Sequence, residues 1–529
     1  MLSTPRACRE MVSSPHHLAS QSGLAILREG GTAIEAAVAM AATLSVVYPH
    51  MTGVGGDAFW LLAEPERKPI GIDACGAAGI NVSVRLYRDA LFERIPWRGA
   101  LAANTVAGAV SGWQTALRVN ADWGGRLSIN RLLEDAVEYA ENGVPVTASQ
   151  AAALTQTATE LAVVPGFANA FLQSPAVARE GGKLRQPALA ATMRALAREG
   201  LDSFYRGRLG QKIAQDLANA GSPLLAEDIV AHQATFTDPL SLSLRNARVY
   251  NLSAPTQGVV SLLILGCFDR LGVEQADGFD HIHGLVEASK QAFRVRDSQI
   301  GDPALTGSEL RRFLSADRLD ADARNIDKRR ATPWLRYPDR GDTVWFGVID
   351  QAGRAVSAIQ SLYFEFGSGI VLPQTGIIWQ NRGCAFALSG PGPNVLAPRR
   401  KPFHTLNPAM ARLADGRTMV YGAMGGEGQP QTQRVVFTRY ALFGQSLQAS
   451  VTAPRWLLGR TWGEDTTWLR IENRFEPGVI EALERAGHLI QRVEPFTAAM
   501  DHAGAVVRTA DSIFEAACDP RSDGAALGW

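Results

Sequence analysis

The sequence predicts a mixed α/β fold in which stacked sheets are enclosed by helices, and three observations predict it. Helical patterns dominate the first part of the chain, and one of these helices is rich enough in alanine to pack very closely. Alternating and β-branched patterns typical of hairpins follow Gly341. A predicted strand at residues 418–421 then runs directly into the glycine-rich segment 422–428, which is typical of a strand that ends in a turn.

The bulk composition excludes several classes of protein. The chain has 529 residues, enough for two to four domains at about 150 residues each. Hydrophobic residues make up 46% of the chain and charged residues 20%, as in an ordinary globular protein. Lys plus Arg and Asp plus Glu number 52 each, so no net charge attracts nucleic acid or an anionic membrane. We therefore expect neither as a partner.

The cysteines and histidines do not predict a disulfide framework, a metal centre or a cofactor. The five cysteines are scattered, odd in number and without a Cys-x-x-Cys pair. The nine histidines lack metal-ligand spacing except at His281-Ile-His283, which has only Asp280 nearby and is interpreted as structural. A reducing compartment suits this composition.

The sequence shows no secretory or membrane-spanning segment. The N-terminal residues Met-Leu-Ser-Thr-Pro-Arg lack the apolar stretch of a signal peptide. The apolar run at residues 36–47 is shorter than the ~20 residues that span a bilayer. We therefore expect a cytoplasmic protein.

Helices account for most of the chain before the hairpins. Thr32 is a predicted helix cap with Glu35 at the capping-box position, and the alanine-rich helix that follows ends before Pro49. At Ile129–Asn142 the apolar residues share one helical face, and Gly143 ends the helix. Further helices are predicted at residues 20–29, 112–119, 188–199, 208–220, 226–231, 259–271 and 281–294, and strands at residues 70–73, 240–244 and 248–252.

The glycine-rich loop at residues 51–57 raises the alternative of a dinucleotide site. That fingerprint requires a strand before the glycines and a helix after them. Here a predicted helix precedes the loop and an apolar strand, Ala-Phe-Trp-Leu-Leu, follows it. We interpret the loop as a tight helix-to-strand connection.

The sharpest change of character along the chain occurs at Thr343. A polar, basic segment at residues 327–342 predicts an exposed, flexible loop, and an apolar run follows it. This run and the next form a predicted hairpin that turns at residues 350–353 and places Thr343 opposite Gln360 and next to Ser361. Further strands are predicted at residues 377–380 and 468–472, and helices at residues 432–444 and 478–486. Because threonine commonly starts strands, this pattern alone does not indicate catalysis.

A catalytic threonine requires a base, an oxyanion hole and a substrate pocket. An N-terminal threonine carries its own base, because its α-amino group has an unperturbed pKa of about 7.7–8.0. Thr343 is internal and lacks this amine. A catalytic role therefore requires cleavage of the chain between Asp342 and Thr343.

Short motifs recur in a specific order along nearly the whole chain. They are Ser13-Ser-Pro-His-His-Leu-Ala-Ser, Gly30-Gly-Thr-Ala-Ile-Glu-Ala-Ala-Val, Thr52-Gly-Val-Gly-Gly-Asp, Ala190-Ala-Thr, Phe204-Tyr-Arg-Gly, Ala254-Pro-Thr-Gln-Gly, Val286-Glu-Ala, Asp342-Thr-Val-Trp-Phe, Gly353-Arg-Ala-Val-Ser, Phe366-Gly-Ser-Gly, Lys401-Pro, Asn407-Pro and Gly425-Gly. Each motif is weak alone. In this order and spacing the chain resembles the γ-glutamyltransferase family of N-terminal-nucleophile hydrolases.

Members of that family are made as one inactive chain that cleaves itself, so the resemblance implies both a fold and a chemistry. The implied fold is a four-layer αββα sandwich with helical additions, in which residues 1–342 and 343–529 become the two chains of one domain. Thr343 is then the nucleophile, with its own amine as the base. The other implied catalytic positions are Ser361, a second hydroxyl, and the oxyanion-hole pair Gly425 and Gly426. The two chains form a heterodimer, and a dimer of heterodimers is one assembly to test.

The positions that hold a glutamyl group depart from the family pattern. The family's transferases hold the α-carboxylate with an arginine, and Cys75 stands at that position. The carboxylate that holds the α-amino group is replaced by Ala385. His404 and Thr405 stand in place of the paired serines before the oxyanion glycines. The amino-acid pocket of the transferases is therefore largely rewritten.

The same segments offer candidates for binding a smaller substrate. Arg382 can hold a carboxylate bidentately, and His404 can hydrogen-bond to a substrate. Thr405 and Tyr363 are the other predicted substrate-binding residues. These segments resemble the cytosolic subgroup that includes oxamate amidohydrolase. That resemblance implies hydrolysis of a small amide such as oxamate, to oxalate and ammonia, through an acyl-enzyme.

Two other functions stay open at this point. One is γ-glutamyl hydrolysis or transfer from glutathione-like amides, against which the loss of both glutamyl-binding residues weighs. The other is an unprocessed, non-catalytic paralogue, against which the survival of Thr343, Ser361 and the glycine pair weighs.

Overall fold

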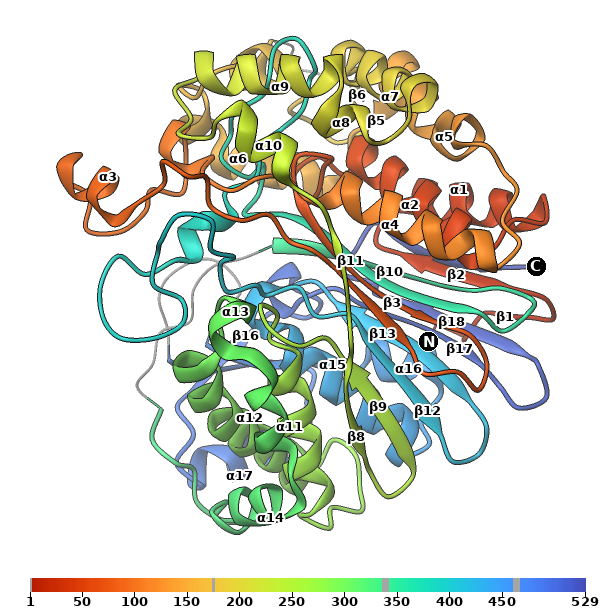
Figure 1. The fold of residues 1–529 in the computed structure, drawn as a ribbon. Coiled ribbons are helices and arrows are strands. Elements are labelled where there is room, and N and C mark those ends of the chain that lie inside the picture. Colours follow the sequence, from red (N-terminus) through yellow and green to blue (C-terminus); the bar gives the residue numbers. More distant parts are fainter. Residues whose placement is uncertain (1, 174–176, 335–341, 460–466) are drawn as a thin grey trace.

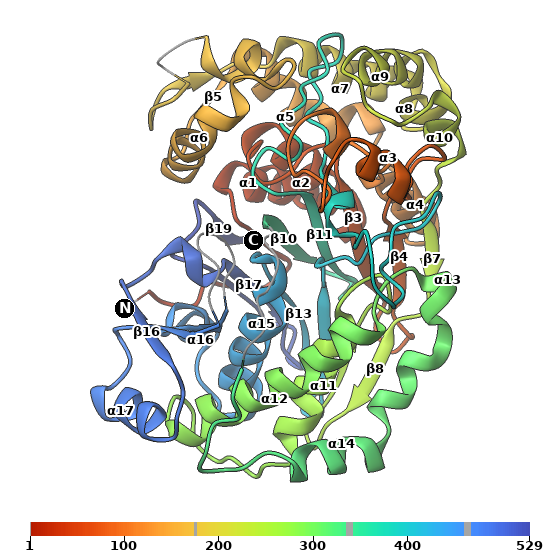
Figure 2. The same ribbon diagram turned by 90° about the vertical axis from the view of Figure 1, so that its left-hand side faces the viewer.

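The computed structural model describes residues 2–173, 177–334, 342–459 and 467–529. Two seven-stranded antiparallel sheets stack face to face, and helices cover both outer faces (Figure 1). The view in Figure 2 shows the same succession of helices, sheet, sheet and helices. The predicted four-layer αββα sandwich with helical additions is confirmed.

The first sheet contains the Thr343 junction and has the strand order β19-β2-β10-β11-β3-β4-β7. In that order the strands are Ala525–Gly528, Met11–Ser14, Asp342–Ile349, Ala355–Tyr363, Asp57–Ala63, Ile70–Ala74 and Thr235–Thr237. The second sheet has the order β1-β18-β17-β13-β12-β9-β8. Its strands are Arg6–Ala7, Phe514–Cys518, Ala503–Arg508, Thr418–Ala423, Ala409–Leu413, Ala247–Asn251 and Leu240–Ser243.

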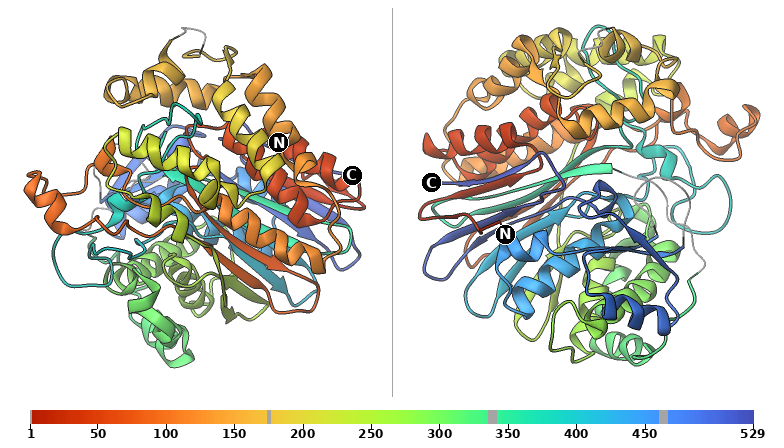
Figure 3. Two further views of the ribbon diagram at one scale, coloured as in Figure 1. Left: turned by 45° about the horizontal axis from the view of Figure 1, so that its top comes forward. Right: turned by 180° about the vertical axis from the view of Figure 1, so that it is seen from behind.

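Helices of the N-terminal half cover the first sheet, and later helices cover the second (Figure 3). The first set comprises α1 (His17–Arg28), α2 (Ala33–Val47), α4 (Ala109–Asp122), α5 (Ile129–Asn142), α6 (Ala148–Leu161), α7 (Pro187–Glu199), α8 (Ser203–Arg206), α9 (Arg208–Asn219) and α10 (Ala226–Ala231), and α3 (Val84–Asp89) projects from the side of this layer (Figure 1). The second set comprises α11 (Gly258–Asp269), α12 (Phe279–Gln299), α13 (Pro303–Thr306), α14 (Ala316–Arg324), α15 (Gln429–Phe437), α16 (Leu447–Thr452) and α17 (Pro477–Arg485). Two small sheets complete the described elements: β5 (Val144–Pro145) with β6 (Lys183–Leu184), and β14 (Trp456–Leu458) with β15 (Leu469–Glu472) and β16 (Ile490–Val493).

Helix α2 begins and packs as its sequence predicts. The Thr32 side chain accepts a hydrogen bond from the Glu35 N–H, and the Glu35 carboxylate accepts one from the Thr32 N–H at 2.8 Å. This capping box satisfies two N–H groups at the helix start that have no partner within the helix. Every residue of α2 is buried. Its alanines let α1 approach on one side and the first sheet on the other.

Strand β10 divides its side chains between two cores. Val344, Phe346 and Val348 lie in the core between the first sheet and its helices. Trp345 and Ile349 lie in the core between the two sheets. Successive residues of a strand point to opposite faces, so both faces of this strand are covered. Fully burying side chains of this size stabilises the fold by about 1.5–3 kcal/mol each.

The register of the β10–β11 hairpin differs by one residue from the predicted one. Val344 pairs with Gln360, and Asp342 pairs with Tyr363, so the register shifts between them. The prediction that Thr343 lies opposite Gln360 is therefore wrong. An extra residue in one strand forms a bulge, which the sequence pattern does not reveal. The shift places Thr343 opposite Ser361 and its neighbour.

Three other expectations need correction. The strand predicted at residues 377–380 makes only isolated bridges, from Ile378 to Val371 and from Trp379 to Gly55. Strands β17, β18 and β19 near the C-terminus were not predicted. The loop predicted over residues 327–342 has exposed side chains at 327–330, but hydrogen bonds hold its backbone to α12. Residues 335–341 lie outside the described part of the chain.

Among the described residues, none of the helices has both the length and the apolar character that crossing a membrane requires.

Candidate active site

Thr343 lies near the C-terminal end of strand β13 because strand β10 of the first sheet packs across β13 of the second. A Cβ added at Gly347 would lie 3.2 Å from the Val420 side chain, and one added at Gly422 would lie 2.0 Å from the Trp345 ring. Gly347 therefore lies over Val420, and Trp345, two residues earlier in β10, lies over Gly422, two residues later in β13. Thr343, two residues beyond Trp345 on the same face, is buried over the end of that strand.

Ser361 faces the same inter-sheet side as Thr343. Ala355 and Ile359 of β11 point into the core between the sheets, and Ser361 follows Ile359 by two residues. Its hydroxyl oxygen accepts a hydrogen bond from the Tyr363 N–H at 2.8 Å. The hairpin therefore brings the two predicted hydroxyl groups to one face at the bulge.

Gly425 and Gly426 form the turn between β13 and α15. Their φ angles are +123° and +52°, and a Cβ added at Gly425 would lie 1.8 Å from the Asp501 carboxylate. Both the backbone conformation and the space therefore require glycine at Gly425. Within the described ranges, neither N–H group is bonded to a protein acceptor. Two such buried donors have the chemistry that an oxyanion hole requires.

One buried glutamine ties this turn to the opposite wall of the site. The Gln257 side-chain amide donates to the carbonyl of Gly426 at 2.8 Å and to the carbonyl of Thr405 at 2.9 Å. Gln257 directly precedes α11. The separation between the glycine turn and the Thr405 segment is therefore fixed by a rigid element.

Arg382 supplies a buried positive charge at that wall. Its side chain is 1% exposed, Nη1 donates to Thr405 Oγ1 at 3.0 Å, and Cζ lies 3.5 Å from the centre of the Tyr363 ring. Nε and Nη2 are buried and have no acceptor. No carboxylate of the described residues forms an ion pair with it. A buried guanidinium with two open donors is suited to bind a carboxylate from outside the protein.

His404 and Asp57 form a buried pair beside Arg382. His404 Nδ1 accepts from the Leu406 N–H at 3.3 Å, so in the neutral ring Nε2 carries the proton and donates to Asp57 Oδ2 at 3.2 Å. Burial, with the charges of Arg382 and Lys401, lowers the pKa of His404 well below its usual range, so the ring is neutral at pH 7. Both ring nitrogens therefore have protein partners, and neither is directed at a substrate.

The Asp57 carboxylate organises the loops around it. Its Oδ1 accepts from the N–H groups of Gly76 and Gly108 and from the Gln380 amide, at 3.0, 3.1 and 3.1 Å. Burial outweighs the opposing effects of these hydrogen bonds and of the Arg382 charge, so the pKa of Asp57 is raised to about 7. Asp57 therefore joins the glycine-rich loop to three segments of the site.

A metal ion does not suit this group of side chains. Asp57, Cys75 and His404 offer ligand atoms within 4.8 Å of one another. However, the His404 nitrogen that faces the group carries a proton, and a ligand nitrogen must offer a lone pair. Burial raises the pKa of Cys75 well above its usual range, so its thiol keeps its proton. Lys401 and Arg382 add positive charge at the same place.

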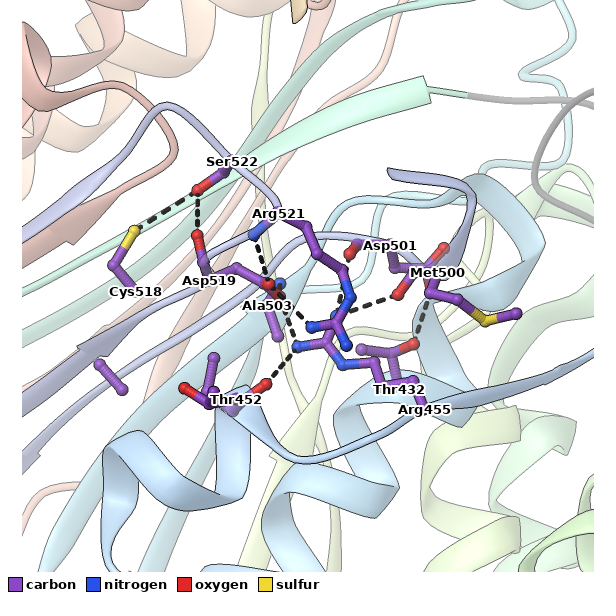
Figure 4. Close-up of polar contacts among 12 residues, drawn as sticks. Thr432, Thr452, Arg455, Met500, Asp501, Ala503, Cys518, Asp519, Arg521 and Ser522 are labelled. Atoms are coloured by element: carbon purple, nitrogen blue, oxygen red, sulfur yellow. Dashed lines mark hydrogen bonds and ion pairs between the residues drawn. The ribbon is translucent and has the colours of Figure 1, made fainter. Parts of the chain in front are cut away.

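A buried network of arginines and carboxylates surrounds Asp501, the residue that packs against Gly425; Figure 4 shows the polar contacts of this network. Arg455 donates to the Asp501 carbonyl at 2.9 Å and pairs with Asp519, which also pairs with Arg521 at 3.0 Å. Asp501 has a φ of +62°, and its carboxylate lies against the Cα of Gly425. The network therefore fixes the surface on which the turn rests.

The structure brings most of the predicted site residues into one wall and leaves two outside it. Direct contacts join Tyr363 to Ser361 and Arg382, and Arg382 to Thr405, while Gln257 links Thr405 to Gly426. Thr343 belongs to the same hairpin as Ser361 and Tyr363, and Gly425 to the same turn as Gly426. His404 lies one layer behind, against Asp57. Asp342 pairs with Tyr363 through its backbone, and its side chain lies outside the described part.

Sequence reasoning assigned no role to Asp57, Gln257 or Asp501. Asp57 ends the motif that starts at Thr52, and Gln257 lies in the motif Ala254-Pro-Thr-Gln-Gly, so both were within recognised segments. Asp501 carried no comparable signal.

Comparison with known proteins gives one consistent family. The Gamma-glutamyltranspeptidase family matches residues 19–529. The oxamate amidohydrolase proenzyme of Klebsiella pneumoniae is 53% identical over 520 residues, which cover 98% of each chain. The glutathione hydrolase-like YwrD proenzyme of Bacillus subtilis is 40% identical over 523 residues, again 98% of each chain. The crystal structure of a cephalosporin acylase from Bacillus halodurans superposes with a TM-score of 0.91 at 30% identity, covering 100% of this chain and 97% of that one.

The first two relatives are proenzymes of hydrolases and the third is an acylase. The two sequence matches cover 98% of this chain, and the structural match covers all of it. The predicted enzyme class, a self-processing amidohydrolase of the N-terminal-nucleophile type, is confirmed. The chain belongs to the gamma-glutamyltranspeptidase family.

Proposed function

We propose that the chain cleaves itself between Asp342 and Thr343 and then hydrolyses the amide of a small carboxylate-bearing substrate, with oxamate as the preferred one. The buried Arg382 guanidinium, with two open donors, is the observation that carries this proposal. The buried guanidinium requires an anion as a partner. Its contacts with Thr405 and with Tyr363, a residue of the Thr343 hairpin, hold it next to that hairpin, so a bound anion would lie there too. The 53% identity to an oxamate amidohydrolase supports the choice of substrate.

Self-cleavage uses the same groups as catalysis. The Thr343 hydroxyl attacks the carbonyl carbon of Asp342, the peptide C–N bond breaks, and the Asp342 acyl group moves from nitrogen to oxygen. Water then hydrolyses the ester, which frees the Thr343 amine and hydroxyl. The N–H groups of Gly425 and Gly426 stabilise the oxyanion in each step.

In the mature enzyme the Thr343 amine takes the hydroxyl proton while the hydroxyl oxygen attacks the oxamate amide carbon. The C–N bond breaks and ammonia leaves with that proton. The resulting oxalyl ester is attacked by water, which the same amine activates. Oxalate leaves and Thr343 is regenerated. Arg382 holds the carboxylate that does not react, and Ser361 orients the nucleophile.

The two chains stay together after cleavage because both contribute strands to both sheets. In the first sheet β2, β3, β4 and β7 come from residues 1–342, and β11, β19 and all of β10 except its first residue, Asp342, come from residues 343–529. The product is a heterodimer that cannot separate without unfolding. Association into a dimer of heterodimers is part of the proposal, and mass photometry tests it. The five free cysteines suit a cytoplasmic location, which cell fractionation tests.

Mass spectrometry of the purified protein tests self-cleavage. We expect two fragments, the smaller starting at Thr343. Thr343→Ala should stay intact and inactive, and Thr343→Ser should cleave and turn over substrate more slowly. An intact wild-type chain after long incubation, or unchanged cleavage in Thr343→Ala, would refute the proposal.

Substrate assays test the second step. We expect ammonia release from oxamate to exceed release of the amine from a γ-glutamyl anilide, because Cys75 and Ala385 cannot hold a glutamyl group. The glutathione hydrolase-like relative makes the anilide the relevant comparison. Turnover of the anilide alone would replace oxamate by a γ-glutamyl substrate and leave the self-cleavage proposal intact.

A further inference from the structure

The segment just before the cleavage junction is tied to helix α12 by buried side chains. Residues 327–332 have no regular secondary structure and their side chains are mostly exposed. Four buried polar side chains lie beneath or beside them, none more than 6% exposed. We call these four residues the α12 clamp: His283, Glu287, Lys290 and His488. The first three lie on α12, and the fourth follows α17.

A buried ion pair holds one end of the segment by its backbone. Lys290 Nζ donates to Glu287 Oε1 at 2.6 Å and to the Thr332 carbonyl at 2.6 Å. Glu287 Oε2 accepts from the Thr332 N–H at 3.1 Å. The Thr332 backbone thus gives each member of the buried ion pair a hydrogen-bond partner: its carbonyl binds Lys290 and its N–H binds Glu287. Removing such contacts is costly because a buried charge loses a partner.

A histidine pair holds the other end. His283 Nε2 donates to the Asp327 carbonyl at 2.7 Å, so in the neutral ring Nδ1 accepts from His488 Nε2 at 2.9 Å. The Phe279 ring stacks on His283 at 4.9 Å. His283, Glu287 and His488 also have the composition of a metal-binding set. Their ligand atoms are already committed to the segment, to Lys290 and to one another, which indicates an anchoring role instead.

Between the two ends the segment is held by further contacts. The Ala331 N–H donates to the Ala486 carbonyl at 2.8 Å, and Lys328 Nζ donates to the Leu271 carbonyl at 3.0 Å. The Asp327 carboxylate accepts hydrogen bonds from the N–H groups of Arg329 and Arg330, which closes a turn. A surface loop does not require this many buried partners. The chain therefore enters the junction region from a fixed point.

We propose that the α12 clamp is the anchor from which the precursor segment reaches the nucleophile, so that the clamp residues are positioning residues for self-cleavage. The proposal rests on the self-cleavage proposed above. Ten residues separate Thr332 from Thr343, and a chain of that length spans at most about 35 Å. Fixing Thr332 restricts the conformations of the junction, which raises the fraction of time that the Asp342 carbonyl lies near the Thr343 hydroxyl. After cleavage the same contacts keep the end of the large chain docked.

Cleavage kinetics of clamp variants test this role. Lys290→Met removes the donor to the Thr332 carbonyl, and Glu287→Gln replaces the acceptor of its N–H with little change in volume. We expect each to lengthen the half-time of cleavage about tenfold. Turnover per cleaved molecule should stay at the wild-type value, because the clamp does not contact the substrate. Ser289→Ala, a buried neighbour that bonds only within α12, is the matched control and should cleave normally.

Limited trypsin digestion supplies a readout independent of cleavage. In the uncleavable Thr343→Ala background, Lys290→Met should speed cutting after Arg329 or Arg330 about tenfold, and Ser289→Ala should not. If both clamp variants cleave themselves and are cut by trypsin at wild-type rates, the anchoring role of the α12 clamp is refuted, and the self-cleavage proposal stands. Equal slowing by Ser289→Ala, with equal loss of Tm, would also overturn it, because the helix as a whole would then be responsible. Failure of the wild type to cleave would overturn both proposals.

Discussion

Buried arginines occur in two contrasting settings in this molecule. Behind the glycine turn, Arg455 and Arg521 share Asp519, and Arg521 also pairs with Glu472, all with side chains 0% exposed. Near the Thr343 hairpin, Arg382 has a neutral hydroxyl, an aromatic face and two donors without acceptors. Both sites are buried, but among the described residues only the first has carboxylates in direct contact with its guanidinium groups. Asp57 acts on Arg382 through its charge, without a direct ion pair between these two described residues.

The difference teaches which charges serve the fold and which serve a ligand. A buried charge costs several kcal/mol unless it is paired and hydrogen-bonded. In the Asp519 network, the protein supplies the pairing. At Arg382 the Tyr363 ring offsets part of the cost, because a cation over an aromatic face gains about 1–2 kcal/mol. Under the proposed function, binding of a substrate carboxylate would offset the remaining cost and make the site selective for anions.

The largest effect is expected from breaking the paired network. Asp519→Asn should lower the free energy of unfolding by about 3–5 kcal/mol, because two arginines lose a charged partner in a buried place. Burial alone raises the pKa of Asp519, but Arg455 and Arg521 lower it below its usual value. Its stabilisation is therefore complete at pH 7 and is lost as pH falls through that lowered pKa. Urea unfolding at pH 7 measures the change.

The control for this variant is an ion pair on the surface. Asp238 pairs with Lys68, and both side chains are more than 60% exposed. Asp238→Asn should change the free energy of unfolding by less than about 1 kcal/mol. Equal destabilisation by the two variants would show that burial is irrelevant, and the contrast drawn above would fail.

Removing the unpaired arginine should have the opposite profile. Arg382→Met should lower kcat/KM for oxamate about 100-fold or more, because the substrate carboxylate loses its charged partner. The Tm should stay the same or rise, since a costly buried charge disappears. Steady-state ammonia assays and thermal unfolding measure the two effects. A variant with normal kinetics and a large loss of Tm would place Arg382 with the structural arginines.

In the first layer of the site, local sequence signals predicted the hairpin that carries Thr343 and Ser361, whereas Arg382, Thr405 and the glycine pair came from the family resemblance. The cap at Thr32, the strand that starts at Thr343 and the hairpin to Ser361 depend on neighbouring residues, so pattern and turn chemistry predict them. The one-residue error at Gln360 arose because a bulge depends on cross-strand geometry. Strand β18, Phe-Glu-Ala-Ala-Cys, was missed because its small residues have low β-propensity and are strands only through their neighbours.

The second layer could not be predicted from local signals. The His404–Asp57 contact joins residues 347 positions apart, and the Gln257–Gly426 contact joins residues 169 apart. The contacts of the His404 ring with Asp57 and with the Leu406 N–H were likewise not predicted. Such pairs depend on which loops the two sheets bring together, and one sequence does not contain that information.

A neutral partner of Arg382 provides a finer test. Thr405→Val keeps the shape of the side chain but removes the hydroxyl that accepts from Nη1, so a third donor loses its acceptor. Because hydrogen bonds to charged groups are worth about 1.5–3 kcal/mol, KM for oxamate should rise about tenfold as the guanidinium loses its orientation. Thr405→Ser, which keeps the hydroxyl, should stay near the wild-type KM. Equal effects of the two variants would mean that the methyl contact matters instead.

The smallest effect is expected at Arg434, and it asks whether position or mere lack of a counter-charge defines the substrate site. Arg434 of α15 is 0% exposed, and within the described part of the chain its hydrogen bonds go to neutral partners, Tyr421 at 3.1 Å and Gln433 at 2.6 Å. Burial lowers its pKa, which is the expected sign for a cation without a carboxylate beside it. Like Arg382, Arg434 therefore has no carboxylate partner among the described residues, but it lies away from the Thr343 hairpin.

Arg434→Met removes a buried charge and also two hydrogen bonds, and these changes oppose each other, so the free energy of unfolding should change by only about 1 kcal/mol. KM and kcat for oxamate should stay within about twofold of wild type, because no substrate group reaches α15 at this point. A loss of kcat/KM as large as that of Arg382→Met would mean that any buried arginine without a counter-charge affects catalysis, and Arg382 could then no longer be identified as the carboxylate site by its unpaired charge.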